Sequence, residues 1–335
     1  MVPPWLRGAL RQLLARRERL PYALLLCGPE GAGKLALAEA FARALLCECP
    51  GAEGEACGRC AACGWMEQGA HPDLRRLEPE AETDAGAAEE EGAKRGGTQI
   101  TIGQVRGLAD FINVSSHRGR HKLVLIRPAE SLNMNAANAL LKSLEEPPPA
   151  TCFVLLSHRW QQLPPTIRSR CQRIVLPLPR AEEARAWLEE QGVREPELAL
   201  AQAGGAPLAA LRYDEEYWRA RRSFLDEIAD TELDPLAAAE RLQELPPALA
   251  VEWMQKWSFD LACCRAAGTV RYNLDCAEAL ARLAGRLGAQ EAIRFHRHVL
   301  GLRRIAVHPL NPRLFLEELL LSYAALLRAS RAPAA

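Results

Sequence analysis

The sequence lacks an excess of charge of either sign. Lysine and arginine total 42 residues, and aspartate and glutamate also total 42, so the formal net charge at pH 7 is +0. A protein that binds nucleic acid unaided usually carries a basic field that attracts phosphates. The balance therefore argues against a stand-alone DNA-binding protein and leaves room only for a local basic patch.

The sequence also has no long apolar run. No stretch approaches the roughly 18 residues that a membrane-spanning helix needs. The first residues, 1–7, have neither the basic start nor the apolar core of a secretory signal. We therefore expect a cytoplasmic protein with no membrane partner, in a compartment where thiols stay reduced.

With 335 residues, 49% of them hydrophobic, we expect two or three domains.

A nucleotide-binding loop is present, but it lacks one residue that it needs. An apolar run at 23–26 leads into a glycine-rich turn at 28–34, and a helical pattern follows. In such a loop, backbone N–H groups surround an anion and the lysine reaches the phosphates. The next position normally holds Ser or Thr, whose hydroxyl binds Mg²⁺, and here it is Leu35. The candidate anion-binding residues are Gly28, Gly31, Gly33 and Lys34.

A second part of the ATPase site is missing as well. The apolar strand at 122–126 ends where such ATPases carry a metal-binding Asp and a catalytic carboxylate. This chain has Arg127 and Pro128 there. A guanidinium cannot ligate Mg²⁺, and a proline cannot polarise a water molecule. Two independent losses predict a pseudo-ATPase, for which ATP and Mg²⁺ are not expected at its own site.

Cysteines cluster in one short segment. The chain has 11 cysteines, and Cys57, Cys60 and Cys63 repeat at a spacing that points thiolates at one centre. A fourth ligand would come from Cys47 or Cys49. Four thiolates around Zn²⁺ make a closed structural site, so we predict a zinc module at 47–63. The spacing alone also allows an iron–sulfur cluster, but nothing else in the sequence suggests redox chemistry. The remaining cysteines suit ordinary buried thiols.

Strands and helices alternate through the first half of the chain. Residues 75–97 form an acidic, Gly/Ala-rich stretch, which predicts a mobile surface loop rather than a lure for a basic partner. A helical pattern follows at 100–112. Further elements follow as the strand at 122–126, a helix at 135–146 and strands at 151–157 and 173–177. This alternation predicts an α/β fold, a parallel sheet with helices on both faces, whose nucleotide pocket lies at the carboxyl ends of the strands.

Several motifs together resemble one family. The chain resembles the bacterial clamp-loader branch of the AAA+ ATPases in four places: the segment 45–47 with the three-cysteine repeat, His71-Pro72-Asp73, the segment 136–148 that ends in Leu-Glu-Glu-Pro-Pro, and Ser169-Arg170-Cys171. The resemblance covers essentially the whole chain and is strongest over 20–180.

This resemblance implies a domain plan and a ligand set. It implies a P-loop (AAA+) domain at 1–170 with the inserted zinc module, a small helical lid at 171–211, and an all-α oligomerisation (collar) domain at 212–335. By the match at 45–47, Cys47 is the fourth zinc ligand and Cys49 is an extra cysteine. In the lid, active members carry a phosphate-sensing arginine near residue 207, where this chain has Pro207.

Arg170 illustrates what the resemblance adds. An unplaced arginine is ordinarily a solvated charge or an ion-pair partner. In the family's Ser-Arg-Cys motif it is an arginine finger, which stabilises charge on a phosphoryl group in a neighbouring subunit. The resemblance thus implies a catalytic role in trans for Arg170, with Ser169 and Cys171 beside it.

The function implied is that of a non-motor stator subunit of the DNA polymerase III clamp loader, which acts in DNA replication. It is not an enzyme on its own but belongs to a complex with DNA-directed DNA polymerase activity. The implied partners are the motor subunits (gamma/tau), the clamp-opening delta subunit, the sliding clamp and primed DNA. For DNA contact we consider four weak candidates, for which solvated surface is the ordinary interpretation: Arg106, Arg118, Arg120 and Lys122.

Rival hypotheses come from three other classes. An active motor ATPase of the gamma/tau type shares the cysteines and the Ser-Arg-Cys motif, but Leu35, Arg127 and Pro128 argue against it. A zinc-dependent nucleic-acid-binding module with a vestigial ATPase body would bind primed DNA by itself. A nucleotide kinase also uses a P-loop, but it needs the metal ligands that are lost here.

Overall fold

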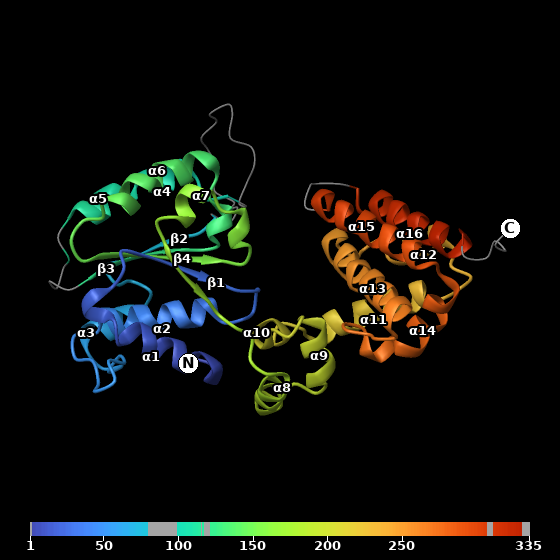
Figure 1. Cartoon of the computed structure of the whole chain (residues 1–335), viewed down its shortest axis with the longest axis horizontal. Helices are drawn as coiled ribbons and strands as arrows, with labels where there is room; N and C mark the ends of the chain where they lie inside the picture. Colours follow the sequence, from blue (N-terminus) through green and yellow to red (C-terminus); the bar gives the residue numbers. More distant parts are fainter. Residues whose placement is uncertain (1, 80–98, 115, 117–120, 307–310, 330–335) are drawn as a thin grey trace. The chain divides into compact units, whose positions relative to one another are not determined.

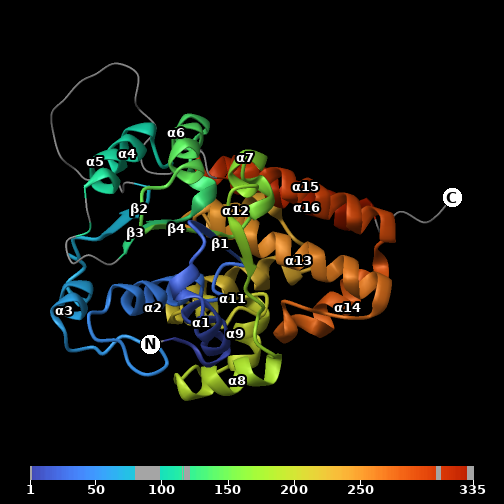
Figure 2. The same cartoon turned by 60° about the vertical axis from the view of Figure 1, so that its left-hand side comes forward.

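The computed structural model describes residues 2–79, 99–114, 116, 121–306 and 311–329. The chain forms two compact units, Met1–Pro179 and Arg180–Ala335, which Figures 1 and 2 colour from blue to green and from yellow to red. No helix within the described ranges is long and apolar enough to cross a membrane.

The first unit is built on a five-stranded sheet in the order β2-β3-β4-β1-β5. All of its pairings are parallel, and Leu25 of β1 lies between Leu155 of β4 and Arg173 of β5. The three central strands are buried along their whole length, which explains their continuous apolar sequences. The strands are β1 (Ala23–Cys27), β2 (Leu74–Leu77), β3 (Lys122–Ile126), β4 (Thr151–Ser157) and β5 (Gln172–Val175).

Helices cover both faces of this sheet (Figure 1). Alternate residues of β1 enter different cores, because Leu24 and Leu26 pack with Phe41 of α2 whereas Leu25 packs with Leu140 of α6. The predicted parallel sheet with helices on both faces is therefore confirmed. The helices of one face are α1 (Arg7–Leu14), α2 (Lys34–Leu46) and α3 (Ala61–Glu67), and those of the other are α4 (Ile102–Arg106), α5 (Leu108–Asn113), α6 (Met134–Glu145) and α7 (Pro165–Arg168). Short 3-10 turns are η1 (Pro4–Leu6), η2 (Arg17–Arg19), η3 (Ala129–Ser131) and η4 (Trp160–Gln162).

Two predictions about the first unit need correction. The segment 75–97 is not a loop throughout, because its first residues belong to β2, which pairs with β3; residues 80–97 lie outside the described ranges. The single helix predicted at 100–112 is two short helices that meet at Gly107.

The first unit also continues beyond the predicted boundary. The predicted first domain ends at residue 170, but β5 follows at Gln172–Val175 and pairs with β1. Because this pairing completes the sheet, the compact unit extends to Pro179.

The second unit is entirely helical in its described residues and has two separate cores. The smaller core lies among α8, α9 and α10, and the larger one extends from Phe224 to Leu327. The division of this unit into a lid and a collar at about residue 211 stays a prediction. The helices are α8 (Ala181–Glu190), α9 (Pro196–Gln202), α10 (Pro207–Ala210), α11 (Glu215–Ala229), α12 (Pro235–Arg241), α13 (Pro247–Ala267), η5 (Leu274–Cys276), α14 (Ala277–Arg286), α15 (Ala289–Ile305) and α16 (Pro312–Ala329).

Tryptophans of α13 form the centre of the larger core. Trp253 is 1% exposed and Trp257 is 0% exposed. Each indole N–H is satisfied, by the hydroxyl of Tyr217 at 3.0 Å and by that of Tyr323 at 2.9 Å. These tryptophans therefore stabilise the fold rather than form a binding site.

A buried polar network joins α9, α11 and α13 within this unit. Asn273 receives hydrogen bonds from Gln202 of α9 at 3.2 Å and from Arg221 of α11 at 2.9 Å. It donates to Asp260 of α13 at 2.9 Å. Arg221, which is 2% exposed, also forms a two-bond ion pair with Asp275, at 2.7 and 2.9 Å. Such a network fixes the relative orientation of its helices, because each donor has a specific partner.

We expect Asp260→Ala to destabilise the second unit by about 3 kcal/mol or more, because each buried donor left without a partner costs about 1–3 kcal/mol. The Asp260 carboxylate is fully buried and accepts bonds from the backbone N–H groups of residues 271–273, which would lose their partner. Urea unfolding followed by tryptophan fluorescence would measure the change. Glu216→Ala, at an exposed position of α11, serves as control, and equal midpoints for the two variants would refute the expectation.

Candidate functional site

The glycine-rich loop lies between the carboxyl end of β1 and the start of α2. Its backbone needs glycine, because Gly31 and Gly33 have φ values of 76° and 99°. At Gly28, where φ is 155°, a Cβ would stand 3.0 Å from the Leu176 carbonyl oxygen. The sequence thus folds here into the turn that the phosphate-loop pattern predicted.

Lys34 is turned back onto this loop. Its ammonium group is buried, with the residue 3% exposed, and donates to the carbonyl oxygens of Gly28 at 2.8 Å and Pro29 at 2.7 Å. Burial lowers the pKa of Lys34 to about 8, and the nearby charge of Glu130 opposes this effect. Leu35 packs against the core under α2, so its side chain offers a hydrocarbon where a metal-binding hydroxyl is needed.

Neither Arg127 nor Pro128, the two residues that follow β3, offers a metal ligand. Arg127 donates its backbone N–H to Leu77 at 2.9 Å and pairs with Glu78 at 2.7 Å. Both contacts are on the β2 side of β3, whereas the phosphate loop follows β1. The Arg127–Pro128 peptide bond is cis.

Glu130 is a residue near the loop that the sequence patterns did not single out. It lies in η3, and its Oε1 accepts a hydrogen bond from the backbone N–H of His158 at 2.8 Å, which ties η3 to the end of β4. Its charge acts on Lys34. Only the folding of β3 and β4 side by side brings Glu130 to this place, so no local motif could have identified it.

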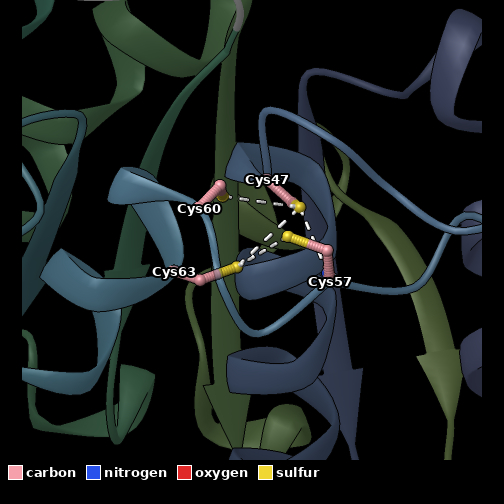
Figure 3. Close-up of side chains that lie close together, drawn as sticks. All are labelled: Cys47, Cys57, Cys60 and Cys63. Atoms are coloured by element: carbon pink, nitrogen blue, oxygen red, sulfur yellow. Dashed lines mark hydrogen bonds between the residues drawn. The ribbon is translucent and has the colours of Figure 1, made fainter.

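The four predicted cysteines meet at one point (Figure 3). Cys47 follows the last residue of α2, Cys57 lies in the connecting loop, and Cys60 and Cys63 lie at the start of α3. Their sulfur atoms all lie within 4.8 Å of one another. Cys49 is exposed and does not belong to this group.

The cluster fits a tetrahedral metal ion. The Sγ–Sγ distances from Cys47 to Cys60 and to Cys63 are both 3.8 Å, and that from Cys57 to Cys63 is 4.0 Å. A tetrahedron with metal–sulfur bonds of about 2.3 Å has edges of about 3.8 Å. The backbone N–H of Cys57 also donates to the sulfur of Cys47 at 3.3 Å, a bond that favours a thiolate there. The cluster can therefore bind a metal such as zinc.

The Ser-Arg-Cys segment lies between α7 and β5. Ser169 and Arg170 are exposed, and the Arg170 guanidinium donates to the Thr166 carbonyl oxygen at 2.9 Å. Cys171 is partly buried against the core, and burial raises the pKa of its thiol to about 12. Cys171 is thus suited to packing rather than to nucleophilic chemistry, while Arg170 remains accessible.

The structure describes two of the four candidates for DNA contact, Arg106 and Lys122. Lys122 is 5% exposed and donates its ammonium group to the Phe111 carbonyl oxygen, so both the weak suggestion of DNA contact and the ordinary interpretation as solvated surface are wrong for it. Arg106 is exposed at the end of α4. Arg118 and Arg120 lie outside the described ranges.

The fold and these sites define a class of protein. It is an AAA+-type P-loop protein with Leu35 after the P-loop lysine, Arg127 and Pro128 at the end of β3, and a four-cysteine cluster after the P-loop helix. Family models described as "DNA polymerase III, delta subunit" and "DNA polymerase III, delta subunit, C terminal" match residues 9–179 and 215–324. DNA polymerase III subunit delta′ of Pseudomonas aeruginosa is 37% identical over 96% of this chain and 97% of its own length. The chain therefore belongs to the DNA polymerase III subunit delta′ family.

A second delta′ subunit agrees with this assignment, and two other proteins share part of the chain or its fold. Subunit delta′ of Escherichia coli is 34% identical over 68% of this chain and 65% of its own length. DNA polymerase III subunit tau of E. coli is also 34% identical, but over only 51% of this chain and 24% of its own length. A solved gamma subunit-related protein of Thermotoga maritima has the same fold, with a TM-score of 0.50 and 19% identity, and covers 95% of this chain and 99% of that one.

Proposed function

We propose that this chain is a non-motor stator subunit of the DNA polymerase III clamp loader and helps to load the sliding clamp onto primed DNA. The observation that carries the proposal is that one domain combines an altered phosphate loop with an exposed arginine. The phosphate loop has Leu35 at its metal-binding position and Lys34 bound to its own loop, whereas Arg170 is accessible at the surface. A subunit that cannot turn over ATP can still complete the site of a neighbour.

Arg170 would act as an arginine finger in trans. A guanidinium placed against the transferring phosphoryl group offsets its developing charge and is worth about 10³–10⁵ in rate in well-studied GTPases. Ser169 would support this arginine by accepting a hydrogen bond from its guanidinium. Cys171 would support it by packing the end of the loop against the core. A motor role for this chain has less support, because the tau match covers only 51% of it.

The four-cysteine cluster would hold one structural Zn²⁺ through Cys47, Cys57, Cys60 and Cys63. Four protein ligands leave no open position for a water molecule or substrate. The metal would therefore fix the connection between α2 and α3 and would take no part in ATP chemistry.

The partners follow from the family. They would be the gamma/tau motor subunits and the delta subunit. The collar domain at 212–335 would close the ring of subunits, and the lid at 171–211 would connect the P-loop domain to the collar. The sliding clamp and primed DNA would be contacted through the complex. Because replication and thiolate-bound zinc both belong to a reducing compartment, the place of action would be the cytoplasm.

We expect the isolated chain to bind Mg²⁺–ATP weakly or not at all. We also expect no ATP turnover from the natural chain. Leu35→Thr restores the hydroxyl but not the carboxylates at positions 127 and 128, so this variant should not turn over ATP either. Equilibrium binding of labelled ATP, with Lys34→Ala as the control, measures this. Tight binding by the natural chain that is lost in Lys34→Ala would contradict the pseudo-ATPase assignment.

A further inference from the structure

Two rigid elements bring Glu145 next to Arg170. Glu145 is the last residue of α6, and Arg170 follows α7 in the loop before β5. Their neighbours Leu144 and Ile167 are 5% and 0% exposed and belong to the same hydrophobic core. The backbone at both positions is therefore fixed by packing, although both side chains are on the surface.

Glu145 and the loop hold the guanidinium from two sides. Nη2 of Arg170 forms an ion pair with Oε1 of Glu145. Nη1 donates to the Thr166 carbonyl oxygen at 2.9 Å and to the Ser169 hydroxyl at 3.3 Å. A guanidinium has five N–H donors, so these three acceptors orient it and leave other donors available for phosphate oxygens.

Stability alone does not account for this carboxylate. A negative charge at the C-terminal end of a helix is unfavourable, because that end carries partial negative charge. The side chains are 33% exposed for Arg170 and 46% for Glu145, and ion pairs of this exposure contribute little to stability. What the pair does provide is a defined direction for an otherwise flexible arginine.

We propose that Glu145 is a positioning residue that holds Arg170 in the orientation it needs to reach a neighbour's phosphates. The inference rests on the proposed role of Arg170 in trans and adds a residue to it. Holding a flexible side chain in advance lowers the entropy cost of reaching the transition state, and a small misplacement costs rate.

The test compares complexes reconstituted with the motor and delta subunits, clamp and primed DNA, each containing either the natural chain or one variant of it. The Arg170-dependent turnover is defined as the DNA-stimulated ATP turnover of the natural complex minus that of Arg170→Ala. Glu145→Ala should lose most of this part, and the double variant Glu145→Ala/Arg170→Ala should equal Arg170→Ala alone. Glu146→Ala, at the next and exposed position, is the matched control and should lose none.

The outcomes separate the two proposals. If Arg170→Ala leaves turnover unchanged, the role of Arg170 in trans fails, and the positioning role fails with it. If Arg170→Ala slows turnover but Glu145→Ala behaves like Glu146→Ala or is faster than the natural complex, only the positioning role fails. It also fails if Glu145→Ala slows the Arg170→Ala complex further, because the effect would then pass through the fold. Glu145→Gln, which keeps an acceptor oxygen without the charge, should retain an intermediate part of the turnover.

Discussion

Arg170→Ala should slow ATP turnover at the one motor site that this subunit faces by about 10³-fold or more, the range seen for arginine fingers. Total turnover of the complex should fall only in part, because in the proposed arrangement the other motor sites would use fingers from other subunits. The chain should stay folded and assemble, since Arg170 is exposed and its neighbours hold the loop. DNA-stimulated ATPase and clamp-loading rates of the reconstituted complex measure the effect.

Two further variants sharpen this prediction. Arg170→Lys should restore little, because an ammonium group cannot reproduce the planar, bidentate contact of a guanidinium with phosphate oxygens. Arg159→Ala removes another exposed arginine of the same unit and should load clamps at the natural rate. If Arg170→Ala also loads at that rate, Arg170 is only a surface charge and the subunit is a scaffold alone.

Loss of zinc should be the second large effect, and it should be local. Metal binding in zinc-finger peptides is worth about 10–16 kcal/mol and is coupled to folding. Here α2 and α3 also pack on a larger domain, so Cys47→Ser should remove zinc and loosen residues 47–64 without unfolding the chain. Metal analysis should give one zinc per natural chain, and hydrogen exchange should show faster exchange confined to this segment.

Cys49→Ser is the matched control for zinc binding. Cys49 is exposed and stands outside the cluster, so its replacement should leave zinc content unchanged. A natural chain without zinc, or a Cys49→Ser variant that loses it while Cys47→Ser keeps it, would overturn the ligand assignment.

The sequence predicted the central strands of the sheet because those strands are buried on both faces. The strands at 122–126 and 151–157 have apolar interiors and the predicted bounds, and only their end residues Lys122, Thr151 and Ser157 are polar. β2 was missed for a physical reason. It has only four residues, Leu74–Leu77, and its two arginines are not buried, so backbone pairing with β3 at the edge of the sheet decides its structure rather than composition.

Local spacing also predicted part of the site. The repeat at Cys57, Cys60 and Cys63 indicated a thiolate cluster, but spacing alone could not choose between Cys47 and Cys49, which are one residue apart. In the structure, the end of α2 decides which cysteine joins the cluster, because it directs Cys47 inward. The pairing of Glu145 with Arg170 depends on α6 and α7 packing in one core, and the approach of Glu130 to Lys34 depends on strands that meet only in the folded sheet.

Steady-state ATP turnover by the purified chain, alone and then mixed with its motor and delta subunits, tests the central claim most directly. We expect no turnover above background from the chain alone. We expect a rise in DNA-stimulated turnover when it joins the motor subunits, and Arg170→Ala should reduce that rise. Turnover by the chain alone that Lys34→Ala abolishes, or motor subunits whose turnover does not change when the chain is added, would contradict the account.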